Sequence, residues 1–355
     1  MDKFKIDSHK LMYHVSRVKS WQDGELIYPI YMEISPIGAC NHRCIFCGLD
    51  FMGYKLRKIS HEVMGKILPE MAGLGLKSIM YAGEGEPFLH QDIGRIIRLT
   101  KQQGIDVAVT SNGALMNPDL AEEILPFCSW IKFSVNAGTP DTYARIHGTR
   151  ARDFDKVIKN LSHAAFYRKK HDVRCTLGIQ ILLLTEVEDE IETLVALARE
   201  IGMDYLVVKP YSQHPQSITR KYQDISYKKY YDLGKTLEKY NTDRFSVIVR
   251  LNTMQQWDAA GKGYDRCLGL PFWSYIDAGG NVWGCSMYLN DDRFLYGNIN
   301  EDTFQNIWEG DRRKKSLELA ENSLSVDTCR VNCRMDNINR YLWELKNPND
   351  HVNFI

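Results

Sequence analysis

The sequence predicts an α/β protein in which a partial (β/α)6 barrel is followed by a smaller α+β domain. Three observations support this fold class. Between residue 31 and about residue 240, short apolar runs alternate with longer runs of helical period, which favours parallel strands joined by right-handed crossovers. Six such β-α units can be counted, which is too few for a closed eight-stranded barrel. Near residue 245 the alternation ends and the pattern of a glycine-turned hairpin begins.

The barrel elements follow one another in a regular order. Strands are predicted at the apolar runs 31–35, 78–82, 106–110, 130–135, 175–183 and 205–209. Amphipathic periodicity places helices after them, over 61–73, 92–103, 119–125, 154–167, 187–201 and 229–240. In barrels of this kind, functional residues gather at the carboxyl ends of the strands. The residues that directly follow each strand are therefore the first candidates for chemistry.

The rest of the chain has a different pattern. A strand is predicted over 245–250, and a hairpin pairs 273–277 with 281–283 across Gly279 and Gly280, since glycine tolerates positive φ. Helices are predicted over 303–308, 311–319 and 336–345. We expect an N-terminal extension over 1–30, a core barrel over 31–240 and an auxiliary domain over 241–355.

The composition excludes several classes of protein. The 355 residues carry 45 Lys and Arg against 45 Asp and Glu, which disfavours a long electrostatic footprint for nucleic acid. No apolar run is long enough to span a bilayer, and the N-terminus lacks the apolar core of a signal peptide. We therefore expect a cytoplasmic protein with no nucleic-acid or membrane partner.

Three of the nine cysteines, Cys40, Cys44 and Cys47, lie in one short loop after the first strand. Cytosolic thiols stay reduced, so this grouping indicates a metal site rather than disulfides. Three thiolates can bind three irons of a [4Fe–4S] cluster and leave the fourth iron open to another ligand. A closed zinc site is the alternative, but it needs four ligands, and His42 could supply the fourth only with strained geometry.

The spacing Cys-x3-Cys-x2-Cys, with Phe46 before the last cysteine, resembles the signature of the radical S-adenosylmethionine (radical SAM) superfamily. The resemblance covers about residues 30–240. It implies that the open iron chelates the amino and carboxylate groups of S-adenosylmethionine. An electron from the cluster then cleaves this cofactor to methionine and a 5′-deoxyadenosyl radical, which abstracts a hydrogen atom from substrate. It also implies a reducing partner such as flavodoxin or ferredoxin.

A second match follows the second strand, where Gly85, Glu86 and Pro87 resemble the family's Gly-Gly-Glu-Pro motif. Glu84 stands where the first of the paired glycines is usual, which is a departure from the motif. Gly85 would let the backbone approach the cofactor, and Glu86 would accept a charge-assisted bond from the methionyl ammonium. The resemblance implies further cofactor contacts at or after the later strands: Ser111, Asn112, Ser134, Asn136 and Gln180.

Four more cysteines, Cys267, Cys285, Cys329 and Cys333, form two separated pairs in the C-terminal part. Four thiolates suit either zinc or an iron–sulfur cluster. Beside the barrel they resemble the auxiliary-cluster domains called SPASM and Twitch. The full SPASM pattern has seven cysteines, so four favour the Twitch type with one fully ligated [4Fe–4S] cluster. Such a cluster has no open iron, which implies that it accepts an electron.

The resemblance and the N-terminal segment together favour a small substrate. Many peptide-modifying relatives carry an N-terminal peptide-binding module, for which the segment before the first strand is too short. We expect oxidation of a secondary alcohol on a carbohydrate-like molecule: a sugar, an aminocyclitol or a nucleotide sugar. Lys209, Tyr211 and His214 lie where the sixth strand ends and are the catalytic candidates, with Lys209 or His214 taking the alcohol proton.

Other reactions stay open at this point. Cys128 or Cys175 could donate a hydrogen atom to a substrate radical, which would make the protein an epimerase, although both also suit a buried core. A maturase would act on a protein or peptide partner. A non-catalytic iron–sulfur or zinc scaffold would keep the cysteines without cleaving S-adenosylmethionine, and the matches at residues 86–87 and 111–112 disfavour it.

Overall fold

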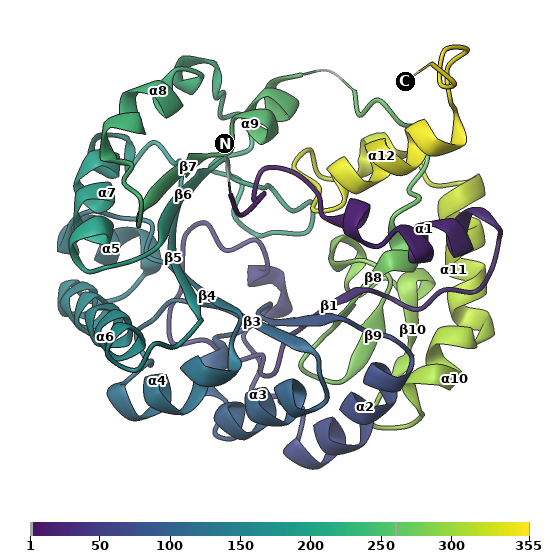
Figure 1. Cartoon of the computed structure of the whole chain (residues 1–355), viewed down its shortest axis with the longest axis horizontal. Coiled ribbons are helices and arrows are strands. Elements are labelled where there is room, and N and C mark those ends of the chain that lie inside the picture. The colour runs from purple at the N-terminus through teal and green to yellow at the C-terminus, as the bar shows by residue number, and fades with distance from the viewer. Residues whose placement is uncertain (1–2, 260, 355) are drawn as a thin grey trace.

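A computed structural model describes residues 3–259 and 261–354 of the chain. Its centre is one ten-stranded sheet with the order β10-β9-β8-β1-β2-β3-β4-β5-β6-β7. All neighbours from β8 to β7 pair in parallel, whereas β9 pairs antiparallel with both β8 and β10. The parallel strands curve into an open arc, and the helices follow its outer side (Figure 1).

The bounds of the elements are as follows. The parallel strands are β1 (Tyr31–Ile34), β2 (Ser78–Tyr81), β3 (Asp106–Ser111), β4 (Trp130–Ser134), β5 (Thr176–Leu182), β6 (Tyr205–Lys209), β7 (Ser246–Val249) and β8 (Trp273–Ile276). The helices between them are α2 (His61–Gly73), α3 (Ile93–Gln102), α4 (Pro118–Ile124), α5 (Pro140–His147), α6 (Ala151–Lys170), α7 (Ile191–Glu200), α8 (Leu233–Leu237) and α9 (Leu251–Asp258). Helix α1 (Val15–Gln22) precedes β1, and β9 (Asn281–Trp283), β10 (Leu295–Asn298), α10 (Phe304–Glu309), α11 (Asp311–Asn322) and α12 (Asp336–Lys346) complete the chain.

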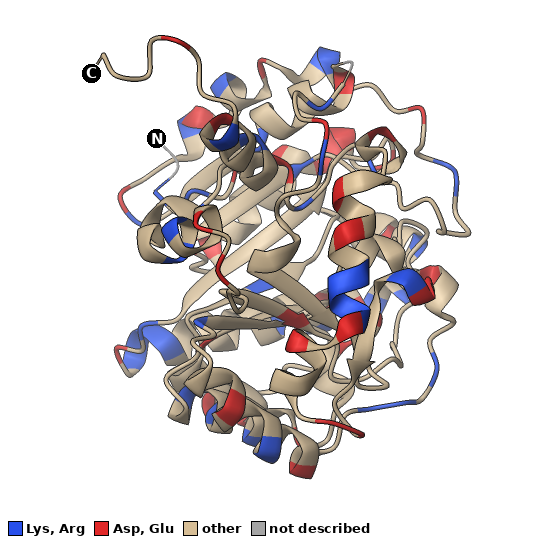
Figure 2. Ribbon diagram, turned by 90° about the vertical axis from the view of Figure 1, so that its right-hand side faces the viewer, with Lys and Arg blue, Asp and Glu red and all other residues tan. Residues whose placement is uncertain are grey.

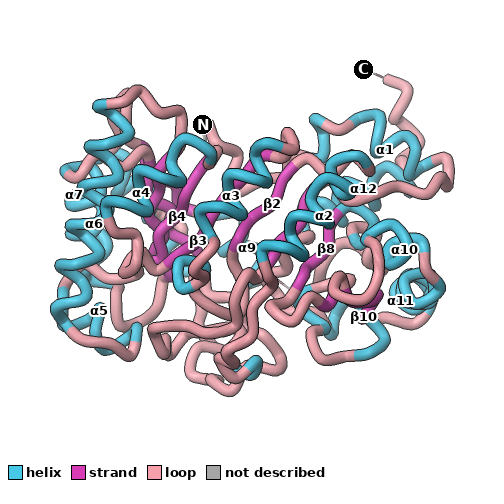
Figure 3. The backbone as a smooth tube through the Cα atoms, turned by 90° about the horizontal axis from the view of Figure 1, so that it is seen from below, coloured by secondary structure: helices cyan, strands magenta, loops and turns pink. Residues whose placement is uncertain are grey.

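The main core lies between the outer face of the sheet and the surrounding helices. In β4, Ile131 and Phe133 are fully buried, and Trp130, Lys132 and Ser134 alternate with them and are less buried. Successive strand residues point to opposite faces, so the second set points into the barrel. Figure 3 shows the strands as a layer behind helices, with long loops gathered on the side away from both termini.

The structure confirms the predicted α/β class and the six barrel strands, each within one residue of its expected bounds. The sheet also extends further, because β7 pairs in parallel with β6 and β8 pairs in parallel with β1. Side-by-side pairing depends on tertiary packing, which apolar periodicity does not report. One sheet therefore crosses the division expected at residue 240, and the domain bounds stay a prediction.

The clearest local difference between prediction and structure is the helix predicted over 229–240. It consists of the short α8, with single 3-10 turns over Lys228–Tyr230 and Glu238–Tyr240 on either side. Gly234 within α8 is a weak helix former. The short helices α5 and α9 were not expected either, because two turns of helix carry little periodic signal.

The segment before β1 packs into the open side of the barrel, where Figure 1 shows it in purple. Phe4 and Ile6 pack on apolar residues of β6 and β7. Asp7 accepts the backbone N–H of Asn252 at 2.8 Å and the hydroxyl of Thr253 at 2.6 Å, which caps the start of α9. The predicted N-terminal extension is thus part of the packed structure.

The equal numbers of basic and acidic residues in the sequence are also mixed over the structure. Figure 2 shows positions of Lys and Arg interspersed with positions of Asp and Glu along the helices and loops. Within residues 3–259 and 261–354, the helices are too short or too polar to cross a bilayer.

Candidate active site and auxiliary metal centre

The three-cysteine loop after β1 is held against the end of α5. The N–H of Arg43 donates to the carbonyl of His147 at 3.0 Å, and the N–H of Ile45 donates to that of Ile146 at 2.9 Å. Gly148 ends α5 with φ +57°, and a Cβ there would lie 2.4 Å from the carbonyl oxygen of Arg43. The position of the loop therefore depends on a helix that sequence reasoning missed.

Cys40, Cys44 and Cys47 are partly buried in this loop. Burial raises the pKa of each of these thiols. For Cys40, burial and the nearby charge of Glu86 raise the pKa to about 12. Three buried thiols close together disfavour bare negative charge. An iron–sulfur cluster would compensate the thiolates, because metal binding and thiol deprotonation are linked. The donor set fits the predicted three-cysteine cluster.

Two histidine rings lie beside Cys44. Nδ1 of His147 is 3.2 Å from Cys44 Sγ, and its Nε2–H donates to the carbonyl of Val135 at 2.9 Å. Burial lowers the pKa of His147 to about 3 and that of His42 to about 4, so both rings are neutral at neutral pH. One ligand atom each of His42, Cys44 and His147 lies within 4.8 Å of the others. Sequence reasoning missed His147, which is 103 residues from Cys44 along the chain.

The carboxylate of Glu86 lies next to the cysteine loop. Its two oxygens accept the hydroxyl of Ser111 at 2.6 Å and the N–H of Asn112 at 2.8 Å. The N–H of Glu86 donates to the carbonyl of Ala39 at 2.9 Å, and the side-chain amide of Asn112 donates to Asn41 Oδ1 at 2.8 Å. The structure thus brings three of the predicted cofactor residues together, directly beside the cysteines.

The structure gives a different reason for glycine at position 85 from the one that we expected. A Cβ at this position would lie 2.2 Å from the carbonyl oxygen of Ile37 and 2.4 Å from that of Ala39. The close approach is therefore to the backbone of the cysteine loop. Pro87 follows at the start of a 3-10 turn and is buried. The motif seats the loop that carries the cysteines.

The candidates on β4 and β5 also meet. Gln180 Nε2 donates to Ser134 Oγ at 2.9 Å, and the two residues are paired in the sheet register. Asn136 has φ +58°, which asparagine tolerates, and its Oδ1 accepts the N–H of Leu182 at 2.9 Å. Gln180 Oε1 and Asn136 Nδ2 are buried with no hydrogen-bond partner among the described residues. An acceptor and a donor thus remain for a bound cofactor.

Lys209 ends β6 among other cations. Burial lowers its pKa well below the usual value, and repulsion from Lys132, Arg250 and Arg330 lowers it further. Tyr211 is buried, and this burial raises the pKa of its phenol to about 12. Of these two catalytic candidates, Lys209 has the environment that favours the neutral, proton-accepting form of its side chain.

His214 is fully buried and both of its ring nitrogens are engaged. Nε2–H donates to the carbonyl of Ser286 at 3.1 Å, and Nδ1 accepts the N–H of Gln216 at 3.1 Å. The ring stacks on Phe51 with centroids 4.7 Å apart, and burial lowers its pKa to about 4. In this arrangement His214 connects two parts of the chain, and a role as proton acceptor would require one of these bonds to break.

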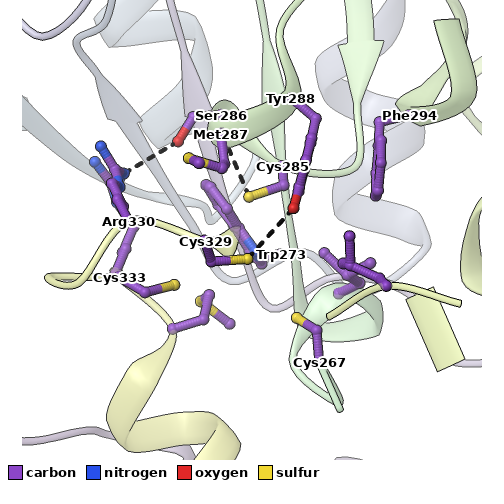
Figure 4. Close-up of a pocket in the computed structure, with 14 residues that line it drawn as sticks. Cys267, Trp273, Cys285, Ser286, Met287, Tyr288, Phe294, Cys329, Arg330 and Cys333 are labelled. Atoms are coloured by element: carbon purple, nitrogen blue, oxygen red, sulfur yellow. Dashed lines mark hydrogen bonds between the residues drawn. The ribbon is translucent and has the colours of Figure 1, made fainter. Parts of the chain in front are cut away.

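The second set of cysteines lines one pocket, and Figure 4 shows their side chains around it. Cys267 precedes β8, Cys285 follows β9, and Cys329 and Cys333 lie in the loop before α12. The hairpin turn between β8 and β9 is the one predicted, with Gly280 at φ +87°. The fold therefore brings two cysteine pairs together from opposite ends of the C-terminal part.

Hydrogen-bond donors surround these sulfurs. Tyr288 hydroxyl lies 3.4 Å from Cys329 Sγ, and Asn339 Nδ2 donates to Cys267 Sγ at 3.6 Å. Burial, with Cys333 and Cys329 close by, raises the pKa of Cys267 to about 12. Buried sulfurs with polar donors suit an iron–sulfur cluster, whose potential depends on such bonds.

One loop connects the two cysteine sites. It follows β6 and contains two of the three catalytic candidates, Tyr211 and His214. At one end Ser212 Oγ donates to the carbonyl of Asn332 at 3.2 Å, next to Cys333. Further along, Ser217 Oγ donates to the carbonyl of Cys47 at 3.2 Å. Six residues of chain thus reach from one cysteine loop to the other.

Comparison with known proteins identifies the family. A model of the radical SAM superfamily matches residues 34–198, which hold the first three cysteines. Residues 34–198 belong to this superfamily. A model of the SPASM iron–sulfur cluster-binding domain matches residues 267–334, which hold the other four. The two matches imply S-adenosylmethionine and two [4Fe–4S] clusters as the cofactors.

Curated relatives share part of the chain. The GTP 3′,8-cyclase of Chlorobaculum tepidum is 28% identical over 189 residues, which are 52% of this chain and 55% of that protein. The S-adenosylmethionine-dependent nucleotide dehydratase of Lacinutrix mariniflava is 24% identical over 238 residues, covering 65% and 49%. The chain spans about half the length of these relatives.

Solved structures share the fold over more of the chain. SuiB of Streptococcus suis bound to S-adenosylmethionine has a TM-score of 0.65 at 19% identity, covering 85% of this chain and 70% of that one. The structure of anSMEcpe with bound AdoMet has a TM-score of 0.59 at 17% identity, covering 88% and 85%. These radical SAM structures confirm the fold class.

Proposed function

We propose that this radical SAM enzyme oxidises a secondary alcohol of a carbohydrate-like small molecule: a sugar, an aminocyclitol or a nucleotide sugar. The observation that carries this proposal is the loop after β6, which is hydrogen-bonded to both cysteine loops. A substrate held at this loop would lie between a source of radical and an acceptor of electrons. The curated relatives that act on nucleotides keep a nucleotide sugar among the candidates.

The reaction must remove a hydrogen atom, an electron and a proton from the alcohol. Conversion of a secondary alcohol to a ketone breaks the C–H bond of the carbinol carbon and the O–H bond, with loss of a hydrogen atom, an electron and a proton. When bound, S-adenosylmethionine with its cluster supplies the 5′-deoxyadenosyl radical that takes the hydrogen atom, and the auxiliary cluster supplies the electron acceptor. The electron that generates the radical comes from a reducing protein such as flavodoxin or ferredoxin. The chain itself must supply the base for the proton.

Lys209 is the base that the environment favours. Its pKa is lowered by burial and by three neighbouring cations, so a share of the amine is neutral and can accept a proton. His214 uses both ring nitrogens in hydrogen bonds. Tyr211 keeps its proton, because burial raises its pKa.

Redox-neutral epimerisation requires a hydrogen-atom donor, and the two candidate cysteines are poorly placed for it. Cys128 and Cys175 are buried in the main core. Cys128 lies two residues before β4 and Cys175 directly before β5, at the amino ends of the strands. The loop with Cys40, Cys44 and Cys47 follows the carboxyl end of β1, which favours oxidation over epimerisation.

The first test counts iron and sulfide after anaerobic reconstitution, in the wild type and in a Cys40→Ala/Cys44→Ala/Cys47→Ala variant. About eight irons in the wild type and about four in the variant are expected, with 5′-deoxyadenosine formed only by the wild type. Sugars and cyclitols deuterated at the carbinol carbon are then screened for transfer of deuterium to 5′-deoxyadenosine. Zinc in the C-terminal site would remove the electron acceptor and contradict the proposed oxidation.

A further inference from the structure

A cavity of about 500 Å³ lies at the amino ends of the barrel strands. Trp130, Thr176 and Tyr205, the first residues of β4, β5 and β6, line one side of it. The N-terminal segment lines the other. The loop with Cys40, Cys44 and Cys47 follows the carboxyl end of β1, so this cavity lies at the opposite end of the strands from that loop. Its volume is typical of a small-molecule site, for which about 300–1,000 Å³ is usual.

The described residues that line this cavity carry charge of one sign. Among the described residues that line it, four are lysines and none is acidic; the lysines are Lys3, Lys5, Lys10 and Lys132. Asp7, the only acid between residues 3 and 10, is turned to the start of α9 and to Arg250. A second cavity of about 360 Å³ shares Lys5, Lys10 and Trp130 with the first and adds Arg334.

Aromatic rings, rather than carboxylates, face these ammonium groups. Lys132 Nζ lies 5.7 Å from the centre of the Trp130 ring, and Lys5 Nζ lies 5.5 Å from that of Tyr13. A cation over an aromatic face gains far less than one paired with an anion in a partly desolvated site. Burial, with repulsion from Arg250, lowers the pKa of Lys132 to about 8. An anion beside Lys132 would stabilise its charged form against both burial and repulsion from Arg250.

We propose that this cavity binds a nucleotide, with Lys5, Lys10 and Lys132 on its phosphates and Trp130 and Tyr13 against its ring. Lysines and flat aromatic side chains together match a ligand that has both charged phosphates and a planar base. The site lies at the amino ends of the strands, and its Lys132 is close enough to Lys209 to lower the pKa of that residue. Because two of the three lysines come from the N-terminal segment, occupancy would fasten that segment to the barrel.

Calorimetry on the reconstituted holoenzyme, saturated with S-adenosylmethionine to occupy the cofactor site, tests the proposal. ATP, inorganic pyrophosphate and adenosine serve as probes. ATP should bind most tightly, because it alone offers both phosphates and a ring. Lys132→Gln and the double variant Lys5→Gln/Lys10→Gln should each weaken ATP binding by about tenfold or more. Lys229→Gln is the matched control, since Lys229 is exposed and paired with Glu188, and it should bind as the wild type does.

Proton uptake gives a second readout. At pH 8 to 9, ATP binding should take up protons in the wild type, because a bound phosphate raises the pKa of Lys132, and it should take up fewer in Lys132→Gln. Lys132→Arg should retain binding, which separates loss of charge from loss of folding. Unchanged ATP affinity in both glutamine variants would contradict the proposed binding site. Equal affinity for pyrophosphate and ATP would contradict the proposal that the ligand is a nucleotide. The yield of ketone per 5′-deoxyadenosine in the Lys5→Gln/Lys10→Gln variant reports on the proposed oxidation separately.

Discussion

Glu84 Oε1 accepts the backbone N–H of Ala278 at 2.7 Å, although 194 residues separate them. Glu84 Oε2 accepts a bond from Arg57 at 2.8 Å, and Arg57 also lies 3.9 Å from Asp277. This is the glutamate that replaces a glycine of the family motif. Its buried carboxylate fastens the end of β2 to the turn between β8 and β9. The departure from the motif therefore joins the barrel to the hairpin that Cys267 precedes and Cys285 follows.

Replacing Glu84 by Ala should lower the free energy of unfolding by about 3 kcal/mol, because it leaves the Arg57 charge and the Ala278 N–H without their partner. Glu84→Gln keeps an acceptor for Ala278 and should cost less. Urea unfolding followed by tryptophan fluorescence measures both. An alanine variant as stable as the wild type would show that the bond contributes nothing.

The loop after β6 depends on Asp50. Its carboxylate accepts the hydroxyl of Ser217 at 3.0 Å and the N–H groups of Ile218 and Thr219 at 2.9 and 3.0 Å. Asp50→Ala should loosen the loop without removing a cluster ligand. We expect unchanged 5′-deoxyadenosine formation with a lower yield of ketone per 5′-deoxyadenosine, measured by chromatography. Asp224→Ala, at an exposed residue beyond this contact, should keep the wild-type ratio, and the same ratio in both variants would contradict a role for Asp50.

Gly85→Ala should disrupt the three-cysteine loop, since a Cβ would lie 2.2 Å from the carbonyl oxygen of Ile37. Iron per chain should fall from about eight toward about four, as in the triple cysteine variant. Gly65→Ala in α2 is the matched control, because its Cβ would meet nothing within 4 Å. That change should retain iron and gain about 0.5–1 kcal/mol from helix propensity. Full iron in Gly85→Ala would mean that the loop adapts.

The pH profile tests Lys209 as the base. Only the neutral amine accepts a proton, so kcat/KM should rise with pH through the pKa of Lys209, which burial and neighbouring cations set below its usual value. Lys209→Gln should lose most activity and this rise, while still cleaving S-adenosylmethionine. Lys228→Gln, at an exposed lysine, should show the wild-type profile. An unchanged pH profile in Lys209→Gln would show that a group other than Lys209 accepts the proton.

Local patterns predicted a large part of this protein. The strands of the barrel follow from apolar runs such as 205–209, because burying a strand requires apolar residues whatever surrounds it. The first cluster loop follows from the spacing of Cys40, Cys44 and Cys47, because ligands so close in sequence meet in almost any fold. The resemblance to the family implied that Glu86 and Ser111 both contact the cofactor, and the structure places them 2.6 Å apart.

The fold class and the three-cysteine loop could be predicted because they depend on residues that are near one another along the chain. Contacts between distant residues depend on how the whole chain packs. His147 beside Cys44, Glu84 on Ala278 and the loop between the two cysteine sites each join segments that no local pattern relates. The cationic cavity is of the same kind, because Lys5 and Lys132 meet only once the N-terminal segment packs into the open barrel. The free energy of burial selects these contacts over the whole chain, and no single segment records them.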